Sequence, residues 1–118
     1  MGNDGATPLS LVDGKTLADV FLKRVALTPD LPAYRIKVDG TYQPYSWQKV
    51  YDLVVSVAGS LFEIGVKPGD RVCIVSSTRS EWNVADIANY CVGAVTVPIY
   101  HSSSVEDIAF MLEHSGAT

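Results

Sequence analysis

The run Tyr100-His101-Ser102-Ser103-Ser104 combines residue types that could perform nucleophilic chemistry. A serine nucleophile needs a histidine base within hydrogen-bond reach, a carboxylate that orients this histidine, and oxyanion donors nearby. Neighbours in an extended segment point to opposite sides, so His101 and Ser102 are poorly placed for this reaction. The sequence also lacks a G-x-S-x-G elbow. We therefore interpret the run as the end of a strand followed by the cap of a helix.

The other residues that could act at a site do not form a recognisable pattern. His101 and His114 lie at opposite ends of the last expected helix and cannot share a metal ion on one helical face. Cys73 and Cys91 each lie in an apolar run, which predicts buried, reduced thiols rather than a disulfide or a metal site. Glu81, Asp86 and Glu113 are single acidic residues on expected helices. The adjacent acids Glu106 and Asp107 fall in the first turn of a helix, where the helix dipole explains them, so no catalytic pair of carboxylates is indicated.

Neither glycine-rich phosphate motif, G-x-G-x-x-G or G-x-x-x-x-G-K-[ST], occurs in the chain. Trp47 and Trp82 each fall in the first turn of an expected helix and are interpreted as packing anchors. We accordingly expect no catalytic, cofactor-binding or metal-binding residue among these 118 residues.

Composition is that of one globular domain, with 47% hydrophobic and 19% charged residues. The formal net charge of -4 and the scattered basic residues exclude a nucleic-acid backbone as partner. No apolar stretch approaches the roughly 18 residues of a membrane span, and the N-terminus lacks the regions of a secretory signal. Residues 1–15 are expected to form a flexible leader, and the reduced cysteines favour a cytoplasmic location.

In the first half, periodicity predicts two helices around a hairpin. Thr16 is expected to cap a helix that ends at residues 28–29. Apolar and polar residues alternate over residues 34–38, which predicts a strand, and residues 41–45 are expected to form the return strand. Asp39-Gly40 between them is a pair typical of tight hairpin turns. Pro44 makes the return strand an edge. Ser46 is expected to cap a long helix that ends at Gly65. Its apolar stripe comprises Val50, Leu53, Val54, Val57, Ala58 and Leu61.

In the second half, apolar runs predict buried strands at residues 71–76 and 95–99. Between them Ser80 is expected to cap a helix that ends at Gly93. Its inward residues are Val84, Ile87, Ala88, Cys91 and Val92. Strand, helix and strand over about 30 residues predict a parallel βαβ unit, and therefore an α/β fold in which a β-hairpin and this unit are flanked by helices.

Ser103 and Ser104, followed by Glu106 and Asp107, form a capping-box signature for a last helix that ends at residues 114–116. In a parallel sheet each central strand has a neighbouring strand on both sides. The alternation of strands and helices along the second half of the chain therefore predicts a further strand after Thr118. We therefore expect residues 16–118 to be an incomplete α/β subdomain. Ligands of such sheets bind beyond the carboxyl ends of the strands, which here are residues 76–80 and 100–104.

Four motifs in register carry a family resemblance. They are Tyr45-Ser-Trp-Gln-Lys-Val50, Gly65-Val-Lys-Pro-Gly-Asp-Arg-Val72, Thr78-Arg-Ser-Glu-Trp82 and Gly93-Ala-Val-Thr-Val-Pro-Ile-Tyr100. Their order and spacing resemble the adenylate-forming AMP-dependent synthetases and ligases, and in particular the N-terminal segment of long-chain fatty-acyl-CoA synthetases. The chain departs from the family at Lys49, where an acid is usual, and at Thr78 and Ser80, where asparagine and proline are common.

The resemblance implies an enzyme that joins a long-chain fatty acid to CoA at the expense of ATP, through acyl-AMP, with Mg-ATP and CoA bound by the whole enzyme. The family's phosphate-binding loop and later catalytic motifs are absent here. The chain alone is therefore expected to be inactive and to bind none of these cofactors. Its expected partners are the remainder of the synthetase and its substrates, with peripheral membrane association and homo-oligomerisation through an exposed sheet edge as further expectations.

Two other interpretations stay open at this point. One keeps the superfamily but changes the acid, as in an aryl-activating, amino-acid-activating or carboxylic-acid-reductase adenylation domain. The other is a non-catalytic α/β interaction module, which would unfold cooperatively as a monomer and would have no exposed sheet edge.

Overall fold

A computed structural model of the chain describes residues 14–118. The described residues divide into two compact units, 14–53 and 54–118, which are described separately below. The leader expected for residues 1–15 lies outside the described residues, apart from Gly14 and Lys15. None of the helices among residues 14–118 is long and apolar enough to cross a membrane.

The first unit begins with helix α1, Leu17–Leu27. The Thr16 hydroxyl accepts a hydrogen bond from the Asp19 backbone N–H at 3.0 Å, which confirms the expected cap. Phe21, on the buried side of α1, lies with its ring centroid 6.3 Å from that of Trp47. Trp47 is therefore a packing anchor, as predicted.

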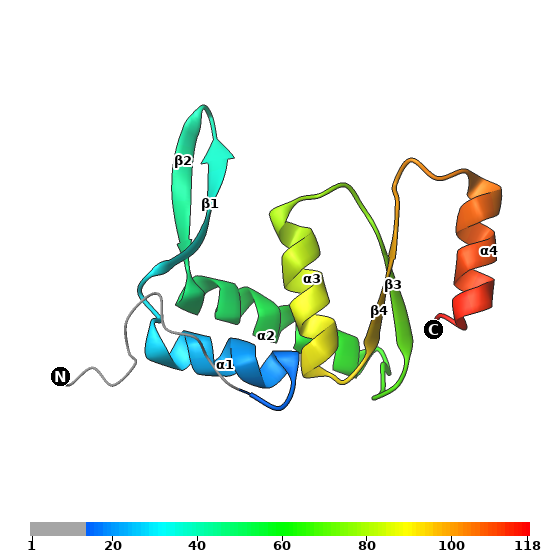
Figure 1. The fold of residues 1–118 in the computed structure, drawn as a ribbon, viewed down its shortest axis with the longest axis horizontal. Helices are drawn as coiled ribbons and strands as arrows, with labels where there is room; N and C mark the ends of the chain where they lie inside the picture. The colour runs from blue at the N-terminus through cyan, green and yellow to red at the C-terminus, as the bar shows by residue number, and fades with distance from the viewer. Residues whose placement is uncertain (1–13) are drawn as a thin grey trace. The chain divides into compact units, whose positions relative to one another are not determined.

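A two-stranded antiparallel hairpin follows, formed by β1 (Pro32–Val38) and β2 (Thr41–Ser46). Both turn residues adopt positive φ, 50° at Asp39 and 80° at Gly40, which confirms the turn that the sequence predicts. Tyr34 and Tyr45 stack across the strands with centroids 5.7 Å apart. The hairpin is the cyan element of Figure 1.

Helix α2, Trp47–Glu63, leads from the first unit into the second. The Ser46 hydroxyl accepts from the Lys49 backbone N–H at 3.1 Å, so the expected cap is confirmed. Val50 and Val54 are the most deeply buried residues of the apolar stripe, each 1% exposed. Leu53 lies on the expected stripe but is 38% exposed, so the prediction is wrong at this position because it lies toward the edge of the buried arc.

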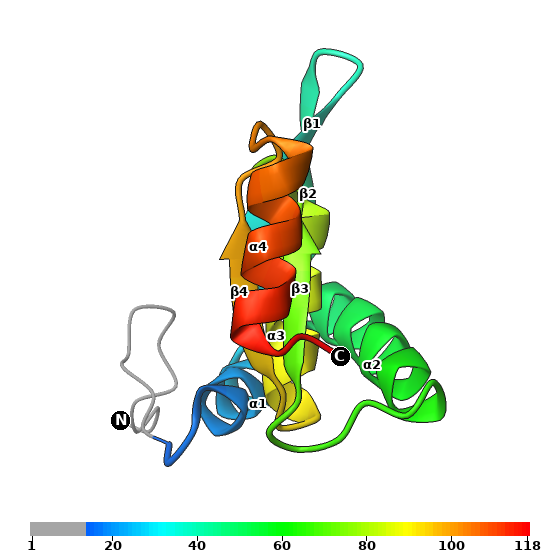
Figure 2. The same ribbon diagram turned by 90° about the vertical axis from the view of Figure 1, so that its right-hand side faces the viewer.

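The second unit contains β3 (Arg71–Val75), α3 (Ser80–Cys91), β4 (Val95–Ile99) and α4 (Val105–Ser115). Strands β3 and β4 pair in parallel, from Arg71 opposite Val95 to Val75 opposite Ile99. Helices α3 and α4 lie on opposite sides of this strand pair, as the two views in Figures 1 and 2 show. The parallel βαβ unit and the α/β fold class are therefore confirmed.

Burial in this unit differs from expectation in the strands. Residues 71–76 and 95–99 were expected to be fully buried, but Val75 is 45% exposed and Val95 is 50% exposed. The reason is that the sheet among the described residues has only two strands, so each strand has an edge without a neighbour. The buried apolar residues of the unit are Val54, Val84, Ala88, Ala94 and Ile99.

Two predictions about α3 are wrong. The cap position is Arg79, without a side-chain cap, and Ser80 is the first helical residue, because its hydroxyl bonds to the Glu81 carboxylate instead of a backbone N–H. Cys91 is exposed rather than buried, since it is the last residue of the helix. Cys73 is half-buried, and both thiols are free. Burial of part of its side chain raises the pKa of Cys91.

Candidate functional site

A cleft of about 260 Å³ lies where β3 and β4 end. Its lining combines three hydroxyl-bearing side chains with aromatic and apolar ones and consists of Ser76, Thr78, Trp82, Pro98, Ile99 and Tyr100. Parallel strands end at the same side of a sheet, and here Val75 pairs with Ile99 at the last position of both strands. Of the two loops that the strand pattern predicts to meet, residues 76–80 and 100–104, the structure brings Ser76, Thr78 and Tyr100 to one cleft.

Trp82 reaches the cleft from the first turn of α3. Its side chain is half-buried, so the indole both packs and forms part of the cleft wall. Tyr100, which directly follows β4, is 82% exposed. The sequence analysis assigned Trp82 to packing alone, because a tryptophan in a first helical turn does not reveal which loop it will face.

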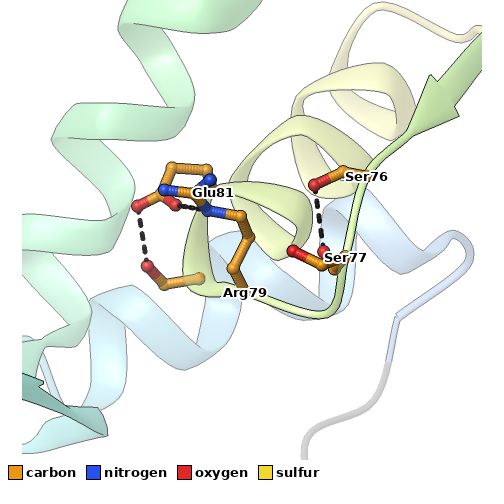
Figure 3. A network of polar contacts seen from close by, with 5 residues as sticks. Ser76, Ser77, Arg79 and Glu81 are labelled. Atoms are coloured by element: carbon orange, nitrogen blue, oxygen red, sulfur yellow. Dashed lines mark hydrogen bonds and ion pairs between the residues drawn. The ribbon is translucent and has the colours of Figure 1, made fainter. Parts of the chain in front are cut away.

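Beside the cleft, residues of the loop after β3 and of the first turn of α3 form a small polar network (Figure 3). The Arg79 guanidinium donates from Nε to Oε1 of Glu81, and the Ser80 hydroxyl donates to Oε2 at 3.0 Å. The hydrogen bond from Arg79, followed by that from Ser80, lowers the pKa of Glu81 below its ordinary value. The lowered pKa makes the Glu81 carboxylate a weaker base, and it does not suit a general acid at neutral pH.

The cleft can bind or pack against another group, and its lining combines hydroxyls with apolar and aromatic surface. None of its lining residues is a carboxylate, an imidazole or an amine. Within residues 14–118 there is also no group of three or more histidine, cysteine or acidic side chains that could hold a metal ion. The lining therefore offers shape, apolar surface and three hydroxyls.

The serine and histidine run adopts the structure expected of a strand end and a helix cap. Ser103 donates its backbone N–H to the Tyr100 carbonyl at 3.0 Å, which forms a turn, and the Ser104 hydroxyl accepts from the Asp107 N–H at 3.1 Å. His101 and Ser102 are exposed on this turn. The histidine at the other end of α4, His114, stacks on Phe110 with centroids 5.4 Å apart.

A contact that the sequence analysis missed joins the start of β3 to the end of α4. Arg71 donates from Nε to the Ser115 carbonyl at 2.9 Å and from Nη1 to the Gly69 carbonyl at 3.3 Å. The glycine at position 116 indicated the end of the helix, but no local pattern points from there to an arginine 44 residues before Ser115.

Comparison with known proteins extends the description of the chain. The sequence profile of the family described as AMP-binding enzyme matches residues 21–118. The chain is 34% identical over 110 residues to the long-chain-fatty-acid–CoA ligase FadD15 of Mycobacterium bovis and 32% identical over 102 residues to long chain acyl-CoA synthetase 4 of Arabidopsis thaliana. These matches cover 93% and 82% of this chain.

The matches account for 18% of the Mycobacterium bovis protein and 15% of the Arabidopsis protein, so the chain spans less than a fifth of these relatives. Among solved structures, a Mycobacterium tuberculosis fatty acyl CoA synthetase superimposes with a TM-score of 0.79 at 24% identity. That superposition covers 87% of this chain and 20% of the synthetase. It supports the fold described above.

Proposed function

Because the chain belongs to the AMP-binding enzyme family, we propose that it forms the N-terminal part of a fatty-acid–CoA ligase. The family match over residues 21–118 carries this proposal, and the 34% identity to a long-chain-fatty-acid–CoA ligase supports the substrate class. The proposed reaction converts ATP, a long-chain fatty acid and CoA into acyl-CoA, AMP and pyrophosphate.

The reaction has two steps in the proposed ligase. A carboxylate oxygen of the fatty acid bonds to the α-phosphorus of ATP while the bond from that phosphorus to pyrophosphate breaks. The CoA sulfur then bonds to the acyl carbon of acyl-AMP, the bond from that carbon to the AMP oxygen breaks, and the thiol loses its proton. Both steps require donors placed around phosphate oxygens, together with a bound divalent cation.

The proposed role of this chain in that enzyme is structural. The lining of its cleft includes no lysine, arginine or carboxylate that could hold ATP phosphates or magnesium. Mg-ATP and CoA are therefore proposed as cofactors of the whole enzyme, and the isolated chain is proposed to be inactive. A cytoplasmic location, with peripheral membrane association, is likewise proposed for the whole enzyme.

The fatty-acid substrate is preferred over an aryl or amino acid because the curated relatives named above act on long-chain fatty acids according to their names. A non-catalytic interaction module is disfavoured by the family membership. It is also disfavoured by the strand edges left without a neighbour in the described sheet, since a self-contained module would cover them.

A chimera tests the proposal. The 110-residue stretch of the Mycobacterium bovis ligase that matches this chain is replaced by the corresponding residues of this chain. We expect AMP and acyl-CoA to form when palmitate, ATP, magnesium and CoA are supplied, and less product with benzoate or an amino acid. The chimera carrying Ser102→Ala is a matched control and should retain full activity, because that serine is not assigned to catalysis.

Two results would overturn the proposal. One is a folded chimera that forms no AMP with any carboxylic acid, since the segment would then be incompatible with the ligase. The other is acyl-CoA formation by the isolated chain, which would mean that these residues contain a complete active site. Thermal unfolding of the isolated chain adds an independent measurement, and we expect no shift of its midpoint with Mg-ATP.

A further inference from the structure

One face of the hairpin formed by β1 and β2 gathers exposed basic and aromatic side chains. Residues directly opposite each other in an antiparallel pair point to the same side, and so do residues two apart in one strand. Arg35 pairs with Pro44. Lys37 pairs with Tyr42. These four side chains therefore share one face, called the basic face here, and all four are exposed.

The opposite face of the hairpin is the one that is partly covered. It carries Tyr34, which pairs with Tyr45, and Ile36, which pairs with Gln43. Tyr34, Ile36 and Tyr45 are half-buried, and the two tyrosine rings stack on each other. The basic face is therefore the outward side of the hairpin.

Positive charge on the basic face lies beside an aromatic ring. The Lys37 ammonium is 5.8 Å from the centroid of the Tyr42 ring, and Tyr42 is 64% exposed. Neither strand contains an acidic residue, and the nearest acids along the chain are Asp30 before β1 and Asp39 in the turn. In a chain of formal net charge -4, the basic face is thus a local concentration of cations.

Charged side chains on edge strands also prevent unwanted strand pairing. That role explains an exposed arginine and an exposed lysine, but it does not require an exposed tyrosine next to them. The combination of lysine, arginine and tyrosine is typical of surfaces that contact a membrane, where the cations meet anionic lipids and the ring lies at the level of the headgroups.

We propose that the basic face is the surface through which the chain contacts an anionic lipid bilayer, with Arg35 and Lys37 on the lipid phosphates and the Tyr42 ring at the headgroup level. This inference rests on the proposed function, because a long-chain fatty acid is a substrate that dissolves in membranes. It assigns the membrane association proposed for the whole enzyme to one element of this chain.

An acidic protein segment is the other partner that two cations could attract, and it fits less well. Recognition of acidic motifs in proteins uses clusters of arginine, because the guanidinium binds a carboxylate through two hydrogen bonds. The basic face has one arginine, and its lysine acts as a point charge without that geometry. A bilayer requires only charge and an interfacial side chain, and the basic face supplies both.

Co-sedimentation of the 118-residue chain with lipid vesicles tests the proposal. One set of vesicles is phosphatidylcholine alone, and the other contains about 30% phosphatidylglycerol. We expect the chain to bind the anionic vesicles about tenfold more tightly than the neutral ones, because both cations are attracted to the anionic surface. Salt at about 0.5 M should remove most of this difference by screening.

Two double variants locate the contact. Arg35→Gln combined with Lys37→Gln removes both cations of the basic face and should weaken binding to the anionic vesicles about tenfold. Lys23→Gln combined with Lys67→Gln removes two exposed lysines elsewhere and changes the net charge equally. This control should weaken binding less than about twofold. Circular dichroism verifies that both double variants are folded.

A pair of tyrosine variants tests the role of the ring. Tyr42→Ser should weaken binding to the anionic vesicles about threefold or more, because the interfacial side chain is lost. Tyr100→Ser replaces a tyrosine that is 82% exposed outside the hairpin, and it should leave the affinity unchanged.

The chimera used to test the proposed function also tests the membrane contact in a complete enzyme. When it carries Arg35→Gln and Lys37→Gln, its activity on palmitate in free solution should be unchanged. Its activity on palmitate embedded in the anionic vesicles should fall about threefold or more.

Several outcomes would overturn the proposal. Equal binding to neutral and anionic vesicles is one, and equal losses in the two double variants are another. Binding to polyglutamate as tight as binding to the anionic vesicles would assign the basic face to an acidic protein segment. Preferential binding to anionic vesicles with an inactive chimera would preserve the membrane contact alone, whereas an active chimera without that preference would preserve the proposed function alone.

Discussion

The side-chain amide of Asn89 donates a hydrogen bond from Nδ2 to Oγ1 of Thr96 at 3.0 Å. Asn89 is 1% exposed on α3, and Thr96 is the second residue of β4. The bond therefore joins the crossover helix to the strand that follows it. A buried amide without a partner costs free energy, so the pair favours the observed placement of α3 on the strands over alternatives.

Replacing Thr96 by valine should destabilise the chain. Thr96→Val keeps the shape of the side chain but removes the acceptor, and this leaves the Asn89 amide buried and unpaired. The expected loss is about 1–3 kcal/mol in the free energy of unfolding, measured by urea denaturation. Thr41→Val, at an exposed hairpin position, is the control and should change stability little. Equal effects of the two substitutions would contradict this account of the pair.

Gly93→Ala should be destabilising for two reasons. Gly93 has φ at 78°, and an added Cβ would lie 3.1 Å from Cβ and 3.3 Å from Cα of Pro68. The same region carries the hydrogen bond from the Gly69 N–H to the Gly93 carbonyl at 2.9 Å, so a backbone shift would also disturb the turn before β3. We expect a loss of about 1–3 kcal/mol in the free energy of unfolding, measured in urea.

Gly59→Ala provides the matched control for that substitution. Gly59 lies inside α2, and a Cβ built there meets no atom within 4 Å. Alanine has a better helix propensity than glycine, so this variant should gain about 0.5–1 kcal/mol. If Gly93→Ala were as stable as Gly59→Ala, the contact with Pro68 would have no energetic role.

Local patterns predicted the elements of this fold because each depends on residues close in sequence. The caps at Thr16 and Ser104 and the turn at Asp39-Gly40 are of this kind, and all three were correct. The expected cap at Ser80 failed because a neighbouring carboxylate, Glu81, competed for its hydroxyl. That competition depends on side-chain rotamers, which a sequence pattern does not specify.

Features that depend on distant residues were less predictable. The two loops of the cleft could be placed together, since the carboxyl ends of parallel strands share one side of a sheet. The contact between Arg71 and Ser115 could not be anticipated, because it requires the packed position of α4 as well as the arginine rotamer. Exposure of Leu53 and Cys91 also depends on how much surface each helix buries, not on apolar periodicity alone.

Ser104→Ala should destabilise α4, whereas Ser102→Ala should not. The Ser104 hydroxyl accepts from the Asp107 N–H at 3.1 Å, and its loss leaves a donor of the first turn without this partner. The expected cost is about 1 kcal/mol, measured by urea denaturation. Ser102 is exposed on the preceding turn and serves as the control. Equal stability of the two variants would show that the cap contributes nothing to the fold.

The ion pair of Arg79 and Glu81 should make stability depend on pH in the acidic range. The pKa of Glu81 is lowered from 4.5 in the folded chain, chiefly by the hydrogen bond from Arg79, so the folded state favours the ionised form. The stabilisation is therefore present above that ordinary pKa and is lost as the pH falls through the lowered value. Arg79→Gln should move the Glu81 pKa back toward 4.5 and reduce this dependence. Carboxyl ¹³C NMR titration measures the pKa of Glu81. The control Lys67→Gln, in the turn before β3, should leave this pKa unchanged. If Glu81 titrates identically in the wild-type chain and in Arg79→Gln, the guanidinium does not lower its pKa.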